Sequence, residues 1–180
     1  MINSDPYVGA MIANSGITCP VPPCLQIIPE RASVVYANEK YVANASAFVT
    51  RYGRNSPYYM NIIGVNKHTW GNNVTINLVL HEYLHNEYRR SFVEFHFKLC
   101  DMINSDPYVG AMVANVGITC PVPPKLQRLV NMTVPSTVNF KFKWPFKKCM
   151  AQVEFALTST GESMAMGNFY LTFADKKFQL

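Results

Sequence analysis

The chain has 180 residues, a formal net charge of +5 and a hydrophobic fraction of 49%, with only 15% charged residues. This length and composition are typical of one globular domain with a sizeable core, and they exclude a disordered chain. No apolar run approaches the ~20 residues that span a bilayer, and no nucleic-acid-binding motif accompanies the positive charge, so we expect no nucleic-acid partner.

The chain begins with a copied segment, because Met1 to Gln26 repeats Met102 to Gln127 with three differences. An offset of 101 residues is not the period of a repeat protein, which is roughly 20–50 residues. The second copy lies within patterned sequence, so we expect the fold to use that copy. We interpret residues 1–26 as a poorly packed duplicate or an error in the gene sequence, and residues 27–180 as a single domain. The differences are Ile12/Val113, Ser15/Val116 and Cys24/Lys125.

Short strands are predicted after the copied segment, from Ser33 to Ala37, from Ala47 to Tyr52 and from Tyr58 to Val65. Residues typical of turns separate them. In the next segment, Val74 to Leu80, every second residue from Val74 onward is apolar. This alternation predicts a strand with one buried face.

A motif that resembles a zinc site follows directly, because His81-Glu82-Tyr83-Leu84-His85 matches H-E-x-x-H. In metallopeptidases, two histidines on one helical face bind zinc and the glutamate activates water. In an extended strand, His81 and His85 would stand about 13 Å apart, too far to share one zinc ion. Glu94 or His96 would have to serve as third ligand. We therefore expect no metal site and no enzyme, and zinc metallopeptidase is the alternative only if this segment is helical.

The next elements are a strand, a short helix and a connector. Val93 to Leu99 alternates apolar and polar residues, which predicts a strand. Asp106 is a good helix N-cap, Pro107 suits the first helical position, and Gly117 can end the helix. Cys120 to Pro124 contains three prolines and is predicted to be a rigid, extended connector.

Three more alternating segments, Val138 to Trp144, Ala151 to Leu157 and Phe169 to Phe173, complete the predicted strands. Seven or eight short strands with turns between them predict a mainly β fold, an antiparallel sandwich or cup with one short helix.

The inward positions of these strands hold many bulky side chains, which either fill a core or line a cavity for an apolar ligand. Periodicity does not decide between the two. The residues are Phe95, Phe97, Phe140, Phe142, Trp144, Phe155, Phe169 and Leu171. Nearby lysines would form a basic rim for an anionic amphiphile, or simply lie on solvated strand faces. They are Lys141, Lys143, Lys147 and Lys148.

The cysteines and glycosylation sequons point to an exported protein. We expect a disulfide between Cys100 and Cys120, because they bracket a compact helical segment and closing a loop of ~20 residues stabilises by roughly 3 kcal/mol. Reduced, buried cysteines are the alternative, and Cys149 has no assigned partner. Three N-x-S/T sequons, which are acceptor sites for N-glycosylation on secretion, begin at Asn44, Asn73 and Asn131.

The order of three segments carries a family resemblance: Ser91 to Asp101, Gly117 to Pro121, and Asn131 to Pro135 followed by lysine-rich strands. From about Ala32 to Lys177, the chain resembles a family of small secreted insect proteins catalogued as a domain of unknown function. That family is similar to the ML (MD-2-related lipid-recognition) superfamily, which includes the ganglioside activator, and to insect chemosensory proteins of the CheB type.

The resemblance implies an immunoglobulin-like β-sandwich opened into a cup, with a hydrophobic cavity for a lipid or hydrocarbon. By position, Cys100 and Cys120 match the cysteine-bearing segments of the family, and Cys149 departs from its pattern. The resemblance also implies a signal peptide on the natural precursor, which we expect to have been lost with the true N-terminus.

The predicted function is therefore that of an extracellular carrier of lipids or other hydrophobic small molecules. A chemosensory role is one form that this function could take. The expected partners are the hydrophobic ligand and a membrane surface or receptor, and no cofactor is expected. The alternative is a secreted protein with a filled core that acts through its surface.

Overall fold

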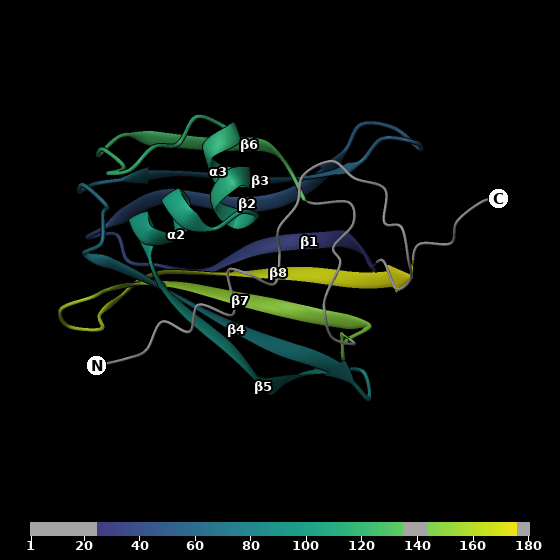
Figure 1. The fold of residues 1–180 in the computed structure, drawn as a ribbon. Helices are drawn as coiled ribbons and strands as arrows, with labels where there is room; N and C mark the ends of the chain where they lie inside the picture. The colour runs from purple at the N-terminus through teal and green to yellow at the C-terminus, as the bar shows by residue number, and fades with distance from the viewer. Residues whose placement is uncertain (1–24, 135–143, 176–180) are drawn as a thin grey trace.

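The computed structural model describes residues 25–134 and 144–175. Within these ranges the chain forms the strands and the two short helices labelled in Figure 1. The strands are β1 (Leu25–Ala37), β2 (Val42–Arg51), β3 (Tyr58–Asn66), β4 (Val74–Leu84), β5 (Glu87–Lys98), β6 (Leu126–Thr133), β7 (Lys148–Leu157) and β8 (Ser163–Asp175). The helices are α2 (Leu99–Ser105) and α3 (Val109–Asn115).

The strands form two antiparallel sheets packed as a sandwich. The larger sheet has the strand order β1-β8-β7-β4-β5, and the smaller has the order β2-β3-β6. In Figure 1 the smaller sheet lies above the larger, with both helices on its side of the molecule. The predicted mainly β, antiparallel sandwich is therefore confirmed, with two short helices in place of one.

Alternation of apolar and polar residues accounts for most of the strands. On β5, Val93, Phe95 and Phe97 are half-buried, while the polar residues between them are exposed. On β4, Val74, Ile76 and Leu80 are buried. The predicted strands at Ala151–Leu157 and Phe169–Phe173 lie within β7 and β8. The predicted strand Val138–Trp144 lies mostly outside the described residues.

Most of the described strands extend beyond their predicted bounds, and one strand was not predicted at all. β6 was not predicted, because its alternation is interrupted by a bulge: the pairing with β3 shifts between Met60 and Ile62, and Asn131 has a φ of 56°. β1 is longer than predicted and begins at Leu25, within the last two residues of the copied segment. β1 therefore includes the last two residues of the copied segment, Leu25 and Gln26.

The helical region contains a break that the sequence analysis missed. Leu99, predicted as the end of a strand, is the first residue of α2 and is 5% exposed. Pro107 disfavours helical backbone at the residue before it, and Asp106 is extended at φ −77° and ψ 120°, so α2 ends there. The Asp106 carboxylate then accepts hydrogen bonds from the backbone N–H groups of Tyr108 and Val109, at 3.0 and 2.6 Å, as a cap for α3.

The contact between the two helices requires a glycine. A Cβ atom at Gly110 would lie 2.4 Å from the carbonyl oxygen of Met102 and 2.8 Å from that of Ile103. These are backbone atoms of α2, so they cannot move away without shifting that helix. The absence of a side chain at Gly110 therefore sets how closely α3 packs on α2.

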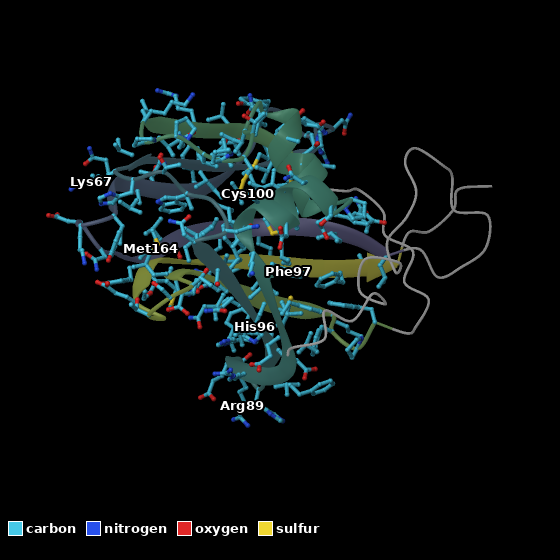
Figure 2. The ribbon with its side chains drawn as sticks, turned by 60° about the vertical axis from the view of Figure 1, so that its left-hand side comes forward. Lys67, Arg89, His96, Phe97, Cys100 and Met164 are labelled. Carbon is cyan, nitrogen blue, oxygen red and sulfur yellow. A yellow bond between two sulfur atoms is a disulfide. The ribbon has the colours of Figure 1, made fainter. Side chains whose placement is uncertain are left out.

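The predicted disulfide joins this helical region to the chain that follows it. The sulfur atoms of Cys100 and Cys120 are 2.05 Å apart, which confirms the pair, and Figure 2 shows Cys100 beside the helices. The connector from Cys120 is held by a bridge between Val122 and Trp70. Neither described helix has the length and apolar character that crossing a bilayer requires.

The buried residues form two separate clusters. The first joins the helices to the nearby ends of the strands, and its buried members are Tyr41, Val42, Val74, Ile76, Leu99, Met102, Ile103, Val122 and Met164. The second lies farther along the larger sheet, and its buried members are Leu80, Phe146, Cys149, Ala151 and Phe173. As far as the chain is described, the second cluster has no member from β2, β3 or β6.

Candidate functional site

Five of the predicted cavity-lining residues lie on the inner face of the larger sheet. Each is half-buried, whereas the fully buried positions of this face belong to the two core clusters. Phe97 and Phe155 pack against the first cluster, and Phe169 and Leu171 pack against the second. The five are Phe95, Phe97, Phe155, Phe169 and Leu171. The rings of Phe95 and Phe97 stack, with centroids 6.2 Å apart.

Trp144, a sixth predicted lining residue, covers part of this face. Its ring centroid is 5.4 Å from that of Phe146 and 4.9 Å from that of Phe173. Phe146 is 3% exposed. The three rings of Trp144, Phe146 and Phe173 therefore cover the larger sheet at the second cluster, to which the smaller sheet contributes no described residue. The other predicted lining residues, Phe140 and Phe142, lie outside the described residues.

The smaller sheet presents its own apolar inner face. Residues opposite each other in an antiparallel ladder point to the same side, and Met132 on this side is 1% exposed, while Arg128 on the other side is exposed. Val42 of β2 belongs to the first core cluster, and Ala45 packs against that cluster. Six further apolar residues lie on the inner side; of these only Met132 is fully buried, and none of the six belongs to either core cluster. They are Ala47, Val49, Met60, Ile62, Leu129 and Met132.

The predicted basic rim is only partly described, since Lys141 and Lys143 lie outside the described residues. Lys147 is exposed. Lys148 precedes the fully buried Cys149 and therefore points to the opposite, outer face of the larger sheet. There its ammonium group lies 2.9 Å from a carboxylate oxygen of Glu30 and 5.1 Å from the ring centroid of Tyr83.

The Lys148–Glu30 pair has the electrostatics of a surface ion pair. The hydrogen bond from Lys148 is the largest influence that lowers the pKa of the Glu30 carboxyl below its ordinary value. In return, the hydrogen bond to Glu30 raises the pKa of Lys148. Lys148 is thus already paired on the outer face, and it does not form a rim for the interior.

The H-E-x-x-H segment is extended, as the alternation predicted. His81 to Leu84 belong to β4, and His85 and Asn86 form the hairpin turn with φ values of 51° and 66°. The helix that would place His81 and His85 on one face is not formed. Burial, and then the charge of Arg90, lower the pKa of His81. The described parts of the chain contain no group of three or more His, Cys, Asp or Glu side chains that could hold a metal ion.

The predicted sequons are at the surface. Asn44, Asn73 and Asn131 are all exposed. The side-chain oxygen of Asn73 accepts a hydrogen bond from the backbone N–H of Gly71 at 2.7 Å, and that of Asn131 accepts one from the Tyr52 hydroxyl at 2.7 Å. Their exposure meets the first requirement for an acceptor site, and glycosylation itself stays a prediction.

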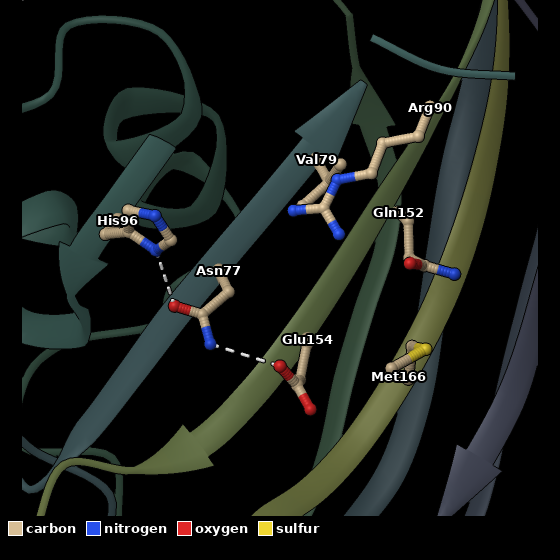
Figure 3. Close-up of a pocket in the computed structure, with 7 residues that line it drawn as sticks. All are labelled: Asn77, Val79, Arg90, His96, Gln152, Glu154 and Met166. Atoms are coloured by element: carbon tan, nitrogen blue, oxygen red, sulfur yellow. Dashed lines mark hydrogen bonds between the residues drawn. The ribbon is translucent and has the colours of Figure 1, made fainter. Parts of the chain in front are cut away.

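A polar pocket that the sequence analysis missed lies on the outer face of the larger sheet. Its volume is about 270 Å³, and its lining residues, drawn in Figure 3, come from β4, β5, β7 and β8. Its lining residues are Asn77, Val79, Arg90, His96, Gln152, Glu154 and Met166. In the sequence, this pocket corresponds to the polar residues that alternate with apolar ones on β4, β5 and β7. Such residues by themselves indicate only a strand face in contact with solvent.

Hydrogen bonds fix the arrangement of this pocket. The ring nitrogen Nδ1 of His96 lies 2.8 Å from the side-chain oxygen of Asn77, and the Asn77 amide nitrogen donates to Glu154 at 3.1 Å. The guanidinium of Arg90 donates to Glu94 at 2.7 Å. The hydrogen bond from Arg90 holds the pKa of Glu94 below its ordinary value.

Cys149 is a free cysteine in the second core cluster, 0% exposed. Burial raises the pKa of its thiol to about 12. Because the thiolate is the reactive form, we expect iodoacetamide at mildly alkaline pH to alkylate Cys149 at least about a hundredfold more slowly in folded than in urea-unfolded protein. Mass spectrometry of the Cys149 peptide over time measures this ratio. Equal rates would show that Cys149 is accessible in the folded protein.

Comparison of the chain with known protein families finds no match, and neither does comparison with curated proteins.

Proposed function

We propose that this protein binds a lipid or another hydrophobic small molecule between its two sheets. The observation that supports this most is the division of the core. The inner face of the larger sheet has a cluster to which β2, β3 and β6 contribute no described residue. Six facing residues of the smaller sheet belong to neither cluster: Ala47, Val49, Met60, Ile62, Leu129 and Met132.

The chemistry of the two faces suits an apolar chain. One face offers half-buried aromatic rings, such as Phe95 and Phe169, and the other offers aliphatic and thioether side chains, such as Ile62 and Met60. Each methylene group that leaves water for such surroundings contributes ~0.8 kcal/mol. An acyl or hydrocarbon chain therefore gains affinity in proportion to the length that is enclosed.

One end of the sandwich is filled by the helical region, so a ligand between the sheets would enter from the opposite end. At the filled end the two helices, the Cys100–Cys120 disulfide and the first core cluster lie together. The ligand would therefore enter at the end where Trp144 and Phe146 lie, and its chain would point toward the helices.

An extracellular location belongs to the same proposal. A disulfide persists in oxidising compartments and is rare in the cytosol, and the pair Cys100–Cys120 is formed. Three exposed sequons agree with passage through a secretory pathway. The resemblance to the ML-like family of secreted insect proteins supports both the location and the ligand class.

The direct test is native mass spectrometry with lipid extraction on the full chain, expressed behind a secretory signal. A bound amphiphile in near-stoichiometric amount supports the carrier function and identifies the ligand class. A protein that carries no lipid after gentle purification, and that takes up no fluorescent fatty acid, would contradict it. That result would favour the alternative function, a secreted protein with a filled core that acts through its surface.

A pair of neighbouring substitutions on β2 tests where the ligand binds. Val49 lies on the inner face, so Val49→Trp fills space between the sheets and is expected to reduce uptake of a fluorescent fatty acid about tenfold, which corresponds to 1.4 kcal/mol. Phe48 lies on the outer face and is 39% exposed, so Phe48→Trp should leave uptake unchanged. Circular dichroism confirms that both variants are folded. Equal uptake by both would place the ligand elsewhere.

A further inference from the structure

The outer-face pocket is separate from the space between the sheets, because its residues alternate with the inward ones. Asn77 lies between the inward Ile76 and Leu78, and Glu154 lies between Val153 and Phe155. In cross-strand register, Asn77 pairs with both Glu154 and His96. The pocket is therefore built on three inner strands of the larger sheet, β8, β7 and β4, and on its edge strand β5.

Two opposite charges line the pocket, Arg90 and Glu154, and they differ in their partners. Arg90 is paired at 2.7 Å with Glu94, a carboxylate outside the pocket lining. Glu154 is half-buried, and its partner is the neutral amide of Asn77 at 3.1 Å. Among the described residues Glu154 forms no ion pair, so its carboxylate is the pocket charge without an ionic partner.

The hydrogen-bonding groups around Glu154 are turned so that the pocket offers acceptors. The Asn77 amide nitrogen is directed at Glu154, so its oxygen faces His96. The Gln152 amide nitrogen lies 3.5 Å from the Asn168 oxygen. Figure 3 accordingly shows the Gln152 oxygen turned away from β8, toward the side where Arg90 lies. Acceptors from Gln152 and Glu154 therefore line the same cavity.

Two apolar side chains complete the pocket. Val79 on β4 and Met166 on β8 lie at its walls, and both are half-buried. A volume of about 270 Å³ is just below the range of about 300–1,000 Å³ for drug-sized ligands. The ligand that fits is therefore small, with a short apolar body and a positively charged donor group.

We propose that this pocket binds the protonated amino group of a small ligand, with Glu154 as its counter-ion and Gln152 as a second acceptor. An ammonium group has three N–H donors and no acceptor, which complements a carboxylate beside an amide oxygen. The apolar body of the ligand contacts Val79 and Met166. Such an amine comes either as a simple amine or as an amino acid, whose carboxylate would meet the spare donors of Arg90.

The test is calorimetric titration of the full chain with three probes that share a phenyl body. Phenethylamine carries the amine alone, phenylalanine carries an amine and a carboxylate, and 2-phenylethanol is the neutral control. We expect at least one of the two amines to bind about tenfold or more tightly than the alcohol, because a hydrogen bond to a charged group is stronger than a neutral one. Tighter binding of phenethylamine would indicate a simple amine as the ligand, and tighter binding of phenylalanine would indicate an amino acid.

Glu154→Gln is the decisive variant, because it removes the charge and keeps an oxygen that accepts from Asn77. We expect it to weaken amine binding about tenfold or more. Glu87→Gln is the matched control, since it removes an equal charge from an exposed carboxylate that pairs with Arg89 at 3.2 Å, and it should bind as the wild type does. The proposal is overturned if neither amine binds at millimolar concentration, if the alcohol binds as tightly, or if Glu154→Gln has no effect.

Discussion

Phe146→Ala is expected to lower the free energy of unfolding by about 3–5 kcal/mol, the range for truncating a buried Phe. Phe146 is 3% exposed, belongs to the second core cluster, and packs edge-on against Trp144 at 84° between ring planes. The smaller sheet contributes no described residue there, so no neighbouring sheet can move in to fill the space. Urea unfolding followed by circular dichroism measures the change.

Phe92→Ala is the matched control for this experiment, because it makes the same chemical change at a side chain that is 88% exposed. Its effect should stay within about 0.5 kcal/mol, as for most surface substitutions. If Phe146→Ala were as mild as Phe92→Ala, the aromatic cover over the larger sheet would not be part of the folded core.

Removal of the disulfide is the second large effect. The variant with both Cys100→Ser and Cys120→Ser should lose about 3 kcal/mol, because a cross-link that closes a loop of ~20 residues limits the unfolded chain. For a chain of this length, that loss lowers the melting temperature by about 6–12 °C. Differential scanning calorimetry of both proteins measures the difference.

A reductant provides the control for the disulfide. The wild type in the presence of a reductant should melt at the temperature of the double variant, and the variant itself should not respond. A wild type that keeps its melting temperature under full reduction would show that the loop is held by its non-covalent contacts alone, such as the bridge between Val122 and Trp70.

Much of the fold could be predicted from the sequence, because a strand with one buried face has a period of two. β4, β5, β7 and β8 have that period over most of their length. β6 was missed because its bulge at Asn131 interrupts the alternation. The helix α2 was missed because it has no side-chain cap at Lys98, so no sequence signal separates its start from the end of β5.

The sites were harder to predict than the fold. The inner aromatic face follows directly from alternation, and the described members lie on it. Lys148 of the predicted rim lies on the outer face, because one residue of offset moves a side chain to the opposite face of a strand. The outer pocket needs residues from four strands in register, and register is set by bulges and turns that local sequence patterns do not reveal.

The position of β8 has a consequence for how the protein is made. Among the described strands of the larger sheet, β1 pairs only with β8, and the register joins Leu25 to Asp175. β1 can therefore join the larger sheet only when β8 is present, since no other described strand of this sheet pairs with it. Such pairing between distant parts of the sequence slows folding. During synthesis on the ribosome, β1 leaves the exit tunnel long before its partner, so the larger sheet can be completed only after β8 has also left the tunnel.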